Sequence, residues 1–372
     1  MRTPATVVEL LQELVRIPSV NPAGEPGTPG VGEERIAREL ADLLSGWGAE
    51  TELRPVEPGR PNVVARFRPD RPGKPRLLFA PHTDTVSVSG MTIEPFGGEL
   101  RDGKIWGRGA SDTKGPMAAM LWALFEERDR LAGLPWEIWF AGLAGEEAGQ
   151  PGAKALAAQE QFDFVIAGEP TGLDVVHTHK GALWLTLQTR GVAVHAASPE
   201  RGVNAIYKMA DVLGCIRDEI APGLAQFSDP VLGPVTISAG VIHGGSKTNI
   251  VPDFCRVEID VRTVPGSGNV ADWVGERLRR VCPDLEMETV QSLPMATDPG
   301  HPMVQALVRA GARPVGAPWF CDAAVFAARG MPAVALGPGS IHQAHTKDEW
   351  ITQADLEDGV RFFRRFLSGL AG

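Results

Sequence analysis

Five short segments of the chain place a histidine or a carboxylate beside turn-forming residues. In chain order they read PHTDT, GRGASDTKG, GEE, GEP and QAHTKDE. Together they supply a first histidine, a set of carboxylates and a last histidine, which are the side chains that a two-metal hydrolytic site uses. Each segment alone is weak evidence. The combination is strong because three of them follow an apolar run directly and most include glycine, the residue typical of turns and loops.

The first segment carries His82 and Asp84, two positions apart. If the preceding strand continues through Thr83, both side chains point to the same face. Asp84 can then hold the ring of His82, because a metal-bound imidazole usually donates its other N–H to a carboxylate. The alternative is a surface-loop histidine beside a solvated acid, and the segment alone gives the two interpretations about equal weight.

Two further carboxylates also have a structural alternative. Asp112 lies in a glycine-bracketed turn before a predicted helix, where it can cap the helix or bridge two metals through its two oxygens. In isolation, capping is favoured. Glu169 follows the apolar run FVIA, and Pro170 fixes the backbone as it leaves the predicted sheet. Without the other segments, Glu169 would be taken for a turn residue.

Glu146 and Glu147 are adjacent, so in an extended or turning backbone we expect them to point in different directions. One can bind a metal while the other faces the substrate pocket, where a general base must stand. A solvated surface pair is the common alternative, but the position beyond the apolar strand WEIWFAG favours function. The last segment contains His345, and His342 lies just before it, in GPGSIHQAHTKDEW. The residues alone leave the choice between these two imidazoles open.

Composition narrows the class of protein. The chain has 372 residues, of which 43% are hydrophobic and 22% charged, so it can bury a large core and is long enough for two domains. Its formal net charge of -10 disfavours a nucleic-acid or anionic-membrane partner, and no basic run interleaved with aromatic residues counters that. We expect a small molecule or a protein as partner.

The cysteines and the first residues bear on location. The four cysteines are scattered and show no CxxC pairing, which is typical of a reducing, cytoplasmic compartment; they are Cys215, Cys255, Cys282 and Cys321. The first residues predict an amphipathic helix rather than a signal peptide, with apolar positions at Val7, Leu10, Leu11, Leu14 and Val15. No apolar stretch approaches the ~20 residues of a membrane span.

The order of predicted elements indicates two domains. Helical and short apolar strand patterns alternate up to about residue 178, which is typical of an α/β unit. From about residue 180 the order becomes β-α-β-β-α-β, that of a ferredoxin-like unit. After residue 292 the α/β pattern resumes. We therefore predict an α/β domain in two parts, 1–179 and 293–372, with 180–292 inserted between them.

The five segments resemble, in order and local sequence, those of the zinc aminoacylase and carboxypeptidase superfamily, which includes acetylornithine deacetylase, succinyl-diaminopimelate desuccinylase and glutamate carboxypeptidase. The resemblance covers nearly the whole chain. It implies a two-domain metallopeptidase fold, with a mixed-sheet catalytic α/β/α domain and an inserted ferredoxin-like α+β lid. It also implies a homodimer formed through the inserted domain.

The resemblance further implies two Zn²⁺ ions, although Co²⁺ and Mn²⁺ suit the same ligands. It assigns His82 and Glu169 to one metal, Glu147 and His345 to the other, and Asp112 to both. This is the reason for preferring His345 over His342. The family pattern also includes a cis peptide bond after Asp112.

The remaining roles are likewise implied by the resemblance. Glu146 takes the position of the general base, and Asp84 that of a support for the metal-bound histidine. GVAVHAASPERGVNAI is similar to the lid motif, which makes His195 the residue that polarises the scissile carbonyl of the neighbouring subunit. KTNIVPD and DVRTVPG resemble segments that hold the substrate carboxylate, so Asn249 and Arg262 are candidates. An arginine fork suits a carboxylate because it donates two hydrogen bonds.

The implied reaction is hydrolysis of the amide bond of an N-acyl amino acid. The segments CDAAVFAARGMPAVAL and GPGSIHQAHTKDEW look more like acetylornithine deacetylases, which act in arginine biosynthesis, than like desuccinylases, whose Gly-Gly-Thr is missing here. N-acetyl-L-ornithine is therefore the first candidate. Succinyl-diaminopimelate desuccinylase, glutamate carboxypeptidase and dipeptidase activities are alternatives within the family.

Two interpretations from other classes rank lower. A non-catalytic metal-binding homologue could lose Glu146 or a ligand freely, whereas every such position is filled here. A phosphatase could use the same kind of two-metal carboxylate site. The lid histidine and the absence of a glycine-rich phosphate-binding loop in the sequence argue against it.

Overall fold

The computed structural model describes residues 4–23, 30–68 and 71–371. The chain divides into two compact units, each built around its own hydrophobic core. Unit 1 comprises Met1–His177, Ala296–Val315 and Cys321–Gly372, and unit 2 comprises Thr178–Met295 with Gly316–Phe320. The predicted class, a mixed α/β fold with two domains, is confirmed.

Unit 1 contains most of a nine-stranded mixed sheet, in which β3, β6, β7 and β17 form the parallel centre and β1 and β2 an antiparallel margin. The strands, in spatial order, are β1 (Glu50–Glu57), β2 (Arg60–Phe67), β6 (Glu137–Gly142), β3 (Arg76–Pro81), β7 (Phe164–Gly168), β17 (Ala333–Ala335), β8 (Val175–His179) and β15 (Met295–Ala296), with β16 (Pro314–Ala317) also paired to β8. The central strands are buried on both faces, which is why they read as continuous apolar runs.

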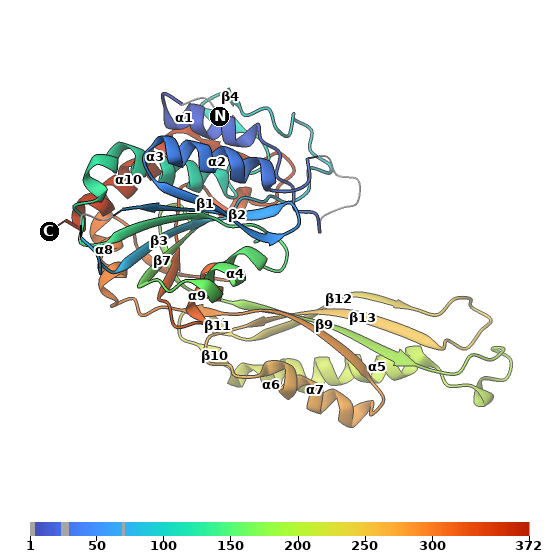
Figure 1. The fold of residues 1–372 in the computed structure, drawn as a ribbon. Coiled ribbons are helices and arrows are strands. Elements are labelled where there is room, and N and C mark those ends of the chain that lie inside the picture. Colours follow the sequence, from blue (N-terminus) through green and yellow to red (C-terminus); the bar gives the residue numbers. More distant parts are fainter. Residues whose placement is uncertain (1–3, 24–29, 69–70, 372) are drawn as a thin grey trace. The chain divides into compact units, whose positions relative to one another are not determined.

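Helices cover both faces of this sheet (Figure 1). One face carries α1 (Val7–Val15), α2 (Glu34–Gly46), α3 (Lys114–Leu131) and α10 (Gln353–Gly369), and the other carries α4 (Pro151–Gln159) and α9 (Ala323–Ala327). A further helix, α8 (Pro302–Ala310), packs beside α10. The five apolar positions predicted for the first helix are all buried in α1. Among the described residues, no helix has the length and apolar character needed to cross a bilayer.

A small three-stranded sheet connects distant parts of unit 1. It is formed by β4 (Glu99–Arg101), β5 (Lys104–Trp106) and β18 (Trp350–Thr352), in the order β18-β5-β4. β18 and β5 run antiparallel. Because β5 shortly precedes Asp112 and β18 shortly follows His345, this pairing brings the segments that carry two predicted ligands together.

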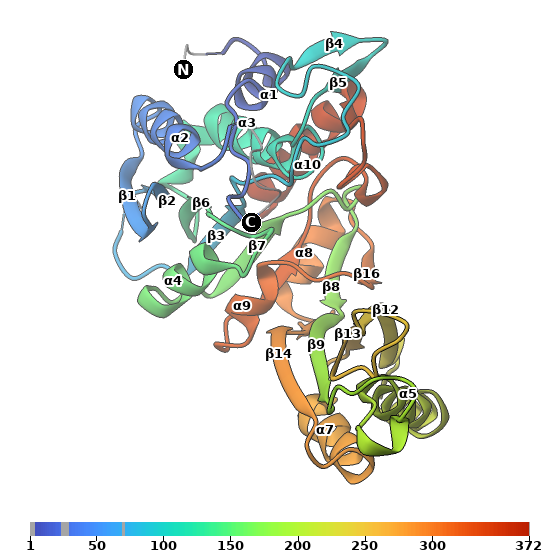
Figure 2. The ribbon, with the colours of Figure 1, turned by 90° about the vertical axis from the view of Figure 1, so that its right-hand side faces the viewer.

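Unit 2 has the predicted ferredoxin-like order. Its elements are β9 (Gly181–Arg190), α5 (Ala205–Cys215), β12 (Thr236–Gly244), β13 (Phe254–Thr263), α7 (Val270–Val281) and β14 (Glu286–Ser292), and the strands pair in the order β12-β13-β9-β14. Alternate residues of β9, Leu183, Leu185 and Leu187, are buried in a core shared with the two helices. Figure 2 shows α5 and α7 on the same face of this sheet.

One segment lies in a different unit from the one predicted. Residues 316–320 were assigned to the catalytic domain, but the structure groups them with unit 2. The N–H of Lys180 donates to the carbonyl of Ala317 at 3.0 Å, and the ring of Phe320 meets Trp184 edge-on with centroids 5.8 Å apart. The segment is short and returns to unit 2 through these long-range contacts, which leave no pattern in the local sequence.

Candidate metal centre

Three neighbouring strands of unit 1 end beside the predicted site. His82 follows β3 directly, Glu169 follows β7 directly, and the turn that carries Glu146 and Glu147 begins shortly after β6. Because β3, β6 and β7 are parallel neighbours, their carboxyl ends meet at one edge of the sheet, where open α/β sheets bind ligands. The backbone turns sharply before the two glutamates at Gly145, which has a φ of 80°.

Asp112 and His345 reach the same place from other segments. Asp112 lies just before α3, whose N-cap residue is Thr113, so the capping interpretation of Asp112 does not apply. The hydroxyl of Thr113 donates to the carbonyl of Gly168, which ties this segment to the end of β7. The peptide bond between Asp112 and Thr113 is cis, as predicted. His345 follows a short 3-10 turn and has a φ of 58°.

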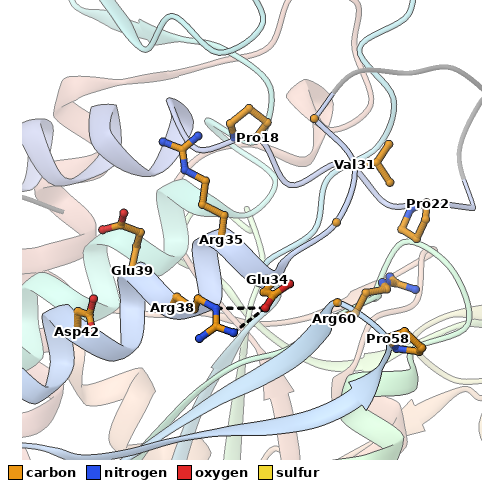
Figure 3. Close-up of a pocket in the computed structure, with 13 residues that line it drawn as sticks. Pro18, Pro22, Val31, Glu34, Arg35, Arg38, Glu39, Asp42, Pro58 and Arg60 are labelled. Atoms are coloured by element: carbon orange, nitrogen blue, oxygen red, sulfur yellow. Dashed lines mark hydrogen bonds and ion pairs between the residues drawn. The ribbon is translucent and has the colours of Figure 1, made fainter.

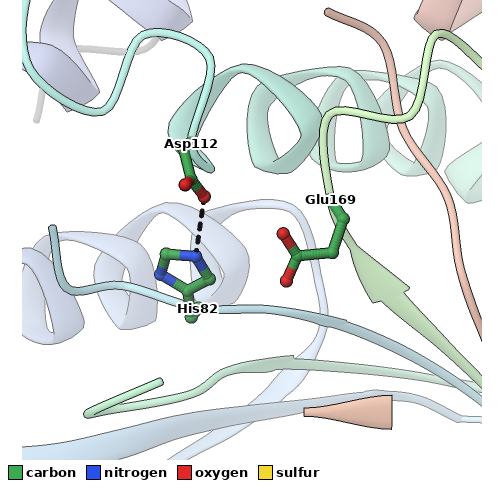
Figure 4. A group of neighbouring side chains, drawn as sticks. All are labelled: His82, Asp112 and Glu169. Carbon is green, nitrogen blue, oxygen red and sulfur yellow. Dashed lines mark hydrogen bonds and ion pairs between the residues drawn. The ribbon is translucent and has the colours of Figure 1, made fainter. Parts of the chain in front are cut away.

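The two carboxylate oxygens of Asp112 face two different imidazoles. Oδ1 lies 3.1 Å from Nε2 of His82, and Oδ2 lies 3.5 Å from Nε2 of His345. In Figure 4, the carboxylates of Asp112 and Glu169 both approach the ring of His82. Two groups of possible ligand atoms result, each within 4.8 Å of one another: His82, Asp112 and Glu169, and Asp112, Glu147 and His345. They share Asp112, which is the arrangement that two bridged cations require.

The adjacent glutamates lie closer together than predicted. Glu146 and Glu147 were expected to point in different directions, but each offers an oxygen to a third group with His82, in which all ligand atoms lie within 4.8 Å of one another. Both residues lie in the turn that follows β6. Oε2 of Glu147 lies 2.9 Å from Nε2 of His345.

Asp84 holds the turn that carries the glutamates as well as the histidine. Its carboxylate accepts hydrogen bonds from the backbone N–H groups of 145–147 at 3.0 to 3.1 Å and from the side-chain amide of Asn21 at 2.7 Å. Nδ1 of His82 lies 3.0 Å from the backbone carbonyl of Asp84 and 3.4 Å from its carboxylate. Nδ1 therefore carries the proton of the neutral ring, and Nε2, which faces Asp112, is the nitrogen that would bind a metal.

The electrostatics of the cluster fit divalent cations. Burial raises the pKa values of Glu146, Glu147 and Glu169, and neighbouring carboxylates raise them further. Oε1 of Glu147 is buried and has no hydrogen-bond partner among the described residues. Buried carboxylates that crowd one another in this way need compensating positive charge, which bound cations supply. The donor set of imidazole and carboxylate suits zinc and related metals.

Two buried acids of this region were not singled out from the sequence. Glu349 is fully buried and bonds to the segment that precedes Asp112. Asp322 is 1% exposed; its Oδ1 accepts a hydrogen bond from Gln150 at 3.2 Å, and its Oδ2 has no partner among the described residues. Burial raises the pKa of Asp322 to about 7. The sequence signals that could have found them are the place of Glu349 at the end of QAHTKDE and that of Asp322 inside the apolar run CDAAVF.

His195 and Asn249 lie together on two loops of unit 2, and both are exposed. The N–H of Ala196 donates to the carbonyl of Asn249 at 3.0 Å. The N–H of Ala197 donates to Nδ1 of His195 at 3.1 Å. Since Nδ1 accepts this bond, the neutral ring carries its proton on Nε2, which is exposed as a donor.

Arg262 lies on β13 of unit 2 and is half-buried. Its Nε donates to Oδ1 of Asp260 at 2.8 Å. This bond fixes the guanidinium on the strand and uses Nε, whereas a carboxylate ligand could take the terminal nitrogens.

One large hollow in unit 1 lies away from the metal cluster. It has a volume of about 860 Å³ and lies beside α2, where the charged side chains of Glu34, Arg35 and Arg38 line it (Figure 3). Arg38 pairs with Glu34 at 2.6 Å. None of the predicted site residues lines this hollow. The convergence of acids and imidazoles, rather than the volume of the cavity, identifies the candidate site.

The fold and the cluster define a class of protein. An α/β sheet that gathers imidazoles and carboxylates around a shared aspartate at its strand ends is the scaffold of a metal-dependent hydrolase. The chain belongs to the peptidase family M20/M25/M40, whose profile matches residues 78–369. It is a metal-dependent hydrolase that acts on amide bonds.

Individual relatives agree with this assignment. The chain is 31% identical to an acetylornithine deacetylase of Klebsiella pneumoniae, over 92% of this chain and 92% of the relative. Among solved structures, it is similar to a tripeptidase of Staphylococcus aureus, with a TM-score of 0.81 and 22% identity over 98% of both chains. It is also similar to a dinuclear metal-binding M20 peptidase of Bacillus subtilis, with a TM-score of 0.69 and 14% identity over 97% of this chain and 96% of that one.

Proposed function

We propose that the chain removes the acyl group from an N-acyl amino acid, with N-acetyl-L-ornithine as the first candidate substrate. The observation that carries the reaction class is the pair of ligand groups that share Asp112. The choice of substrate is supported by similarity to acetylornithine deacetylases over more than nine-tenths of the chain. The segments around Asp322 and His345 support it as well.

In this proposal His82 and Glu169 would hold one Zn²⁺, Glu147 and His345 would hold the other, and Asp112 would be shared by both. Co²⁺ and Mn²⁺ suit the same donors. When bound, the two cations acidify a water molecule and polarise the amide carbonyl. Nε2 of His82 is available for its ion because Nδ1 is occupied by the carbonyl of Asp84.

Glu146 is the proposed general base. It lies in the same turn as Glu147, and the backbone N–H groups of this turn bond to Asp84, so the backbone that carries its side chain is held in place. It takes a proton from the attacking water and returns it to the leaving nitrogen, which makes one residue serve as base and then as acid.

The residues of unit 2 would recognise the substrate. Nε2–H of His195 can donate a hydrogen bond to the oxyanion that forms from the amide carbonyl. Asn249 lies on the neighbouring loop, and Arg262 offers its terminal nitrogens to the substrate carboxylate. We infer that His195 acts from the partner subunit, as the family resemblance implies.

A second copy of the chain has a suitable place to bind on unit 2. β12 is an edge strand of the four-stranded sheet, and Val241 and Ile242 on it are exposed. Nearby on α5, Tyr207 is 72% exposed, and it lines a hollow of about 820 Å³ together with Gly244 and Ile250. An exposed edge strand with apolar neighbours favours pairing with another chain, and a two-fold dimer would cover it.

The first test is amine release from N-acetyl-L-ornithine by protein loaded with Zn²⁺ or Co²⁺. N-succinyl-diaminopimelate, acyl-glutamates and dipeptides are assayed in parallel, and a phosphate ester serves as the control for another chemistry. We expect turnover of N-acetyl-L-ornithine that a chelator abolishes and added metal restores. That result would support a role in arginine biosynthesis.

Other outcomes would change the proposal in different ways. Turnover of another amide alone would retain the two-metal mechanism and reassign the substrate. Hydrolysis of the phosphate ester would contradict the reaction class. The cytoplasmic location predicted from the cysteines remains a prediction, which localisation of a tagged chain would check.

A further inference from the structure

Glu349 bonds to four groups of the segment that leads to Asp112. One carboxylate oxygen, Oε1, accepts the N–H of Ser111 at 2.7 Å and the N–H of Asp112 at 2.8 Å. The other, Oε2, accepts the N–H of Gly109 and Nη1 of Arg108, both at 2.9 Å. The side chain is fully buried, so these bonds replace water completely.

The same residue is connected to His345. Only four positions separate them in the chain, and Nη1 of Arg108, which pairs with Glu349, also donates to the carbonyl of Thr346 at 3.1 Å. The backbone carbonyl of Glu349 accepts the N–H of Gly107 at 3.0 Å, next to the β18-β5 pairing. The segments of Asp112 and His345 are therefore fixed to one another through Glu349 and Arg108.

The position requires a carboxylate. All four groups that contact the Glu349 side chain are hydrogen-bond donors, so both of its oxygens must accept. A glutamine would turn one oxygen into an NH₂ group, which would face two of these donors. It would also remove the negative charge that balances the buried guanidinium of Arg108. The negative charge of Glu349 also lies close to that of Asp112, and the two carboxylates repel one another.

We propose that Glu349 is a positioning residue that sets the separation of Asp112 and His345, and thereby the cation affinity of the group that these residues form with Glu147. The inference rests on the proposed metal centre. Glu349 itself belongs to none of the ligand groups. It acts through the backbone N–H of Asp112 and through Arg108.

The test is a Co²⁺ titration of the metal-free full-length chain, followed by calorimetry and by visible absorption, which reports the ligand geometry. We compare the wild type with Glu349→Gln and with Glu349→Asp, which keeps the charge but shortens the side chain. Changes in residues that orient metal ligands typically cost 10–100-fold in affinity, so we expect a loss of about that size in at least one of the two sites. We also expect an altered absorption spectrum.

Glu127→Gln is the matched control. Glu127 is also buried and also pairs with arginine, bonding to Arg364 at 2.9 Å, but it lies near the other end of α3, roughly 20 Å from Asp112 along the helix. We expect this variant to lower the unfolding temperature of the metal-free protein and to keep the wild-type Co²⁺ affinities.

The outcomes separate the two proposals. A wild type that binds no Co²⁺ would overturn the metal centre itself. A wild type that binds two Co²⁺, with both Glu349 variants folded and equal to it in affinity and spectrum, would overturn the role of Glu349 alone. If Glu349→Gln does not fold, Glu349→Asp decides the question by the same readouts.

Discussion

Three buried acids of unit 1 accept hydrogen bonds from the backbone or from other side chains rather than from solvent. Asp84 accepts the N–H groups of the turn that carries Glu146, and Glu349 accepts those of the segment that carries Asp112. Asp322 accepts a bond from Gln150. A carboxylate with several N–H donors holds a loop in one conformation, and this pre-organisation is what a metal site needs.

One substitution can test the role of the proposed base independently of metal binding. Glu146→Ala removes the carboxylate that is to take the proton, while the five proposed ligands remain. We expect a loss of at least about 100-fold in kcat, because general-base catalysis contributes 10²–10⁴-fold. Metal content by atomic absorption should stay at the wild-type level. Retained turnover in a fully metal-loaded variant would contradict the assignment.

His179 gives unit 2 a pH-dependent stability. Its ring is fully buried, stacks on Trp319 and donates from Nδ1 to the carbonyl of Lys180. Burial lowers the pKa of His179 to about 4, against ~6.5 in an unfolded chain. Between about pH 6.5 and pH 4 the ring is protonated in the unfolded state but not in the folded state. The contribution of His179 to the free energy of unfolding is therefore complete above about pH 6.5 and is lost as the pH falls toward 4.

The matched variant is His179→Asn, whose amide can donate the same bond but does not titrate. Between pH 7.5 and 5.5 the free energy of unfolding of the wild type should fall by about 1 kcal/mol more than that of the variant, as the two pKa values of His179 imply. Urea unfolding at both pH values measures this difference. Equal losses in the two proteins would show that His179 is not the titrating group.

The candidate ligands could be found from the sequence because each lies in one of the five short segments that resemble the family's motifs. Glu349 ends one of these segments, QAHTKDE, and Asp322 lies in CDAAVF, but the local sequence assigned neither of them a role. The partners of Glu349 lie 237 to 241 positions earlier in the chain, and Gln150 lies 172 positions before Asp322. What these acids do depends on the tertiary contacts, whereas a buried acid in an apolar run has no distinct signature by itself.

At the scale of elements, the site depends on how α3 begins. Gly115, in its first turn, has no room for a side chain, because a Cβ there would lie 2.4 Å from the carbonyl oxygen of Ala110 and 3.0 Å from Ile351. The helix can therefore approach the loop that carries Asp112 only with glycine at this position. Gly214 in α5 differs, since a Cβ there would meet no atom within 4 Å.

These two glycines form a matched pair. Gly115→Ala must displace α3 or its loop, so we expect a loss of about 1–3 kcal/mol in the free energy of unfolding and weaker Co²⁺ binding. Gly214→Ala should raise the stability by about 0.5–1 kcal/mol and leave Co²⁺ binding unchanged. Urea unfolding and Co²⁺ titration measure both effects. Equal stability changes in the two variants would refute the packing argument.

The elements that were predicted are those with strong local patterns. The central strands and long helices have continuous or periodic apolar residues. β1 was missed because ETELRPVE carries three glutamates and an arginine and is not buried on either face. β4 and β5 were missed because strands of three residues are too short to show a period.

At the scale of the molecule, the proposed dimer makes a sharp prediction about mixed variants. If His195 acts in the partner's site, a dimer of one Glu146→Ala chain and one His195→Ala chain has one complete site. Unfolding and refolding an equal mixture should then restore about a quarter of the wild-type activity, since about half of the dimers are mixed. Sedimentation should show a dimer in each case.

If His195 instead serves its own chain, both sites of the mixed dimer are defective. The mixture would then remain as inactive as its components. Each variant refolded alone is the control, because it contains the same substitutions without a complementary partner.

The proposed ligands span residues 82 to 345, and the bulk of unit 2 is encoded between them. During synthesis, the group of Asp112, Glu147 and His345 therefore cannot form until nearly the whole chain has left the ribosome. Bound cations stabilise only a chain that has their ligands in place. If these residues bind two ions as proposed, a chain that ends inside unit 2 lacks His345 and gains no stabilisation from the second ion. Metal in the cell would then favour the survival of complete chains over truncated ones.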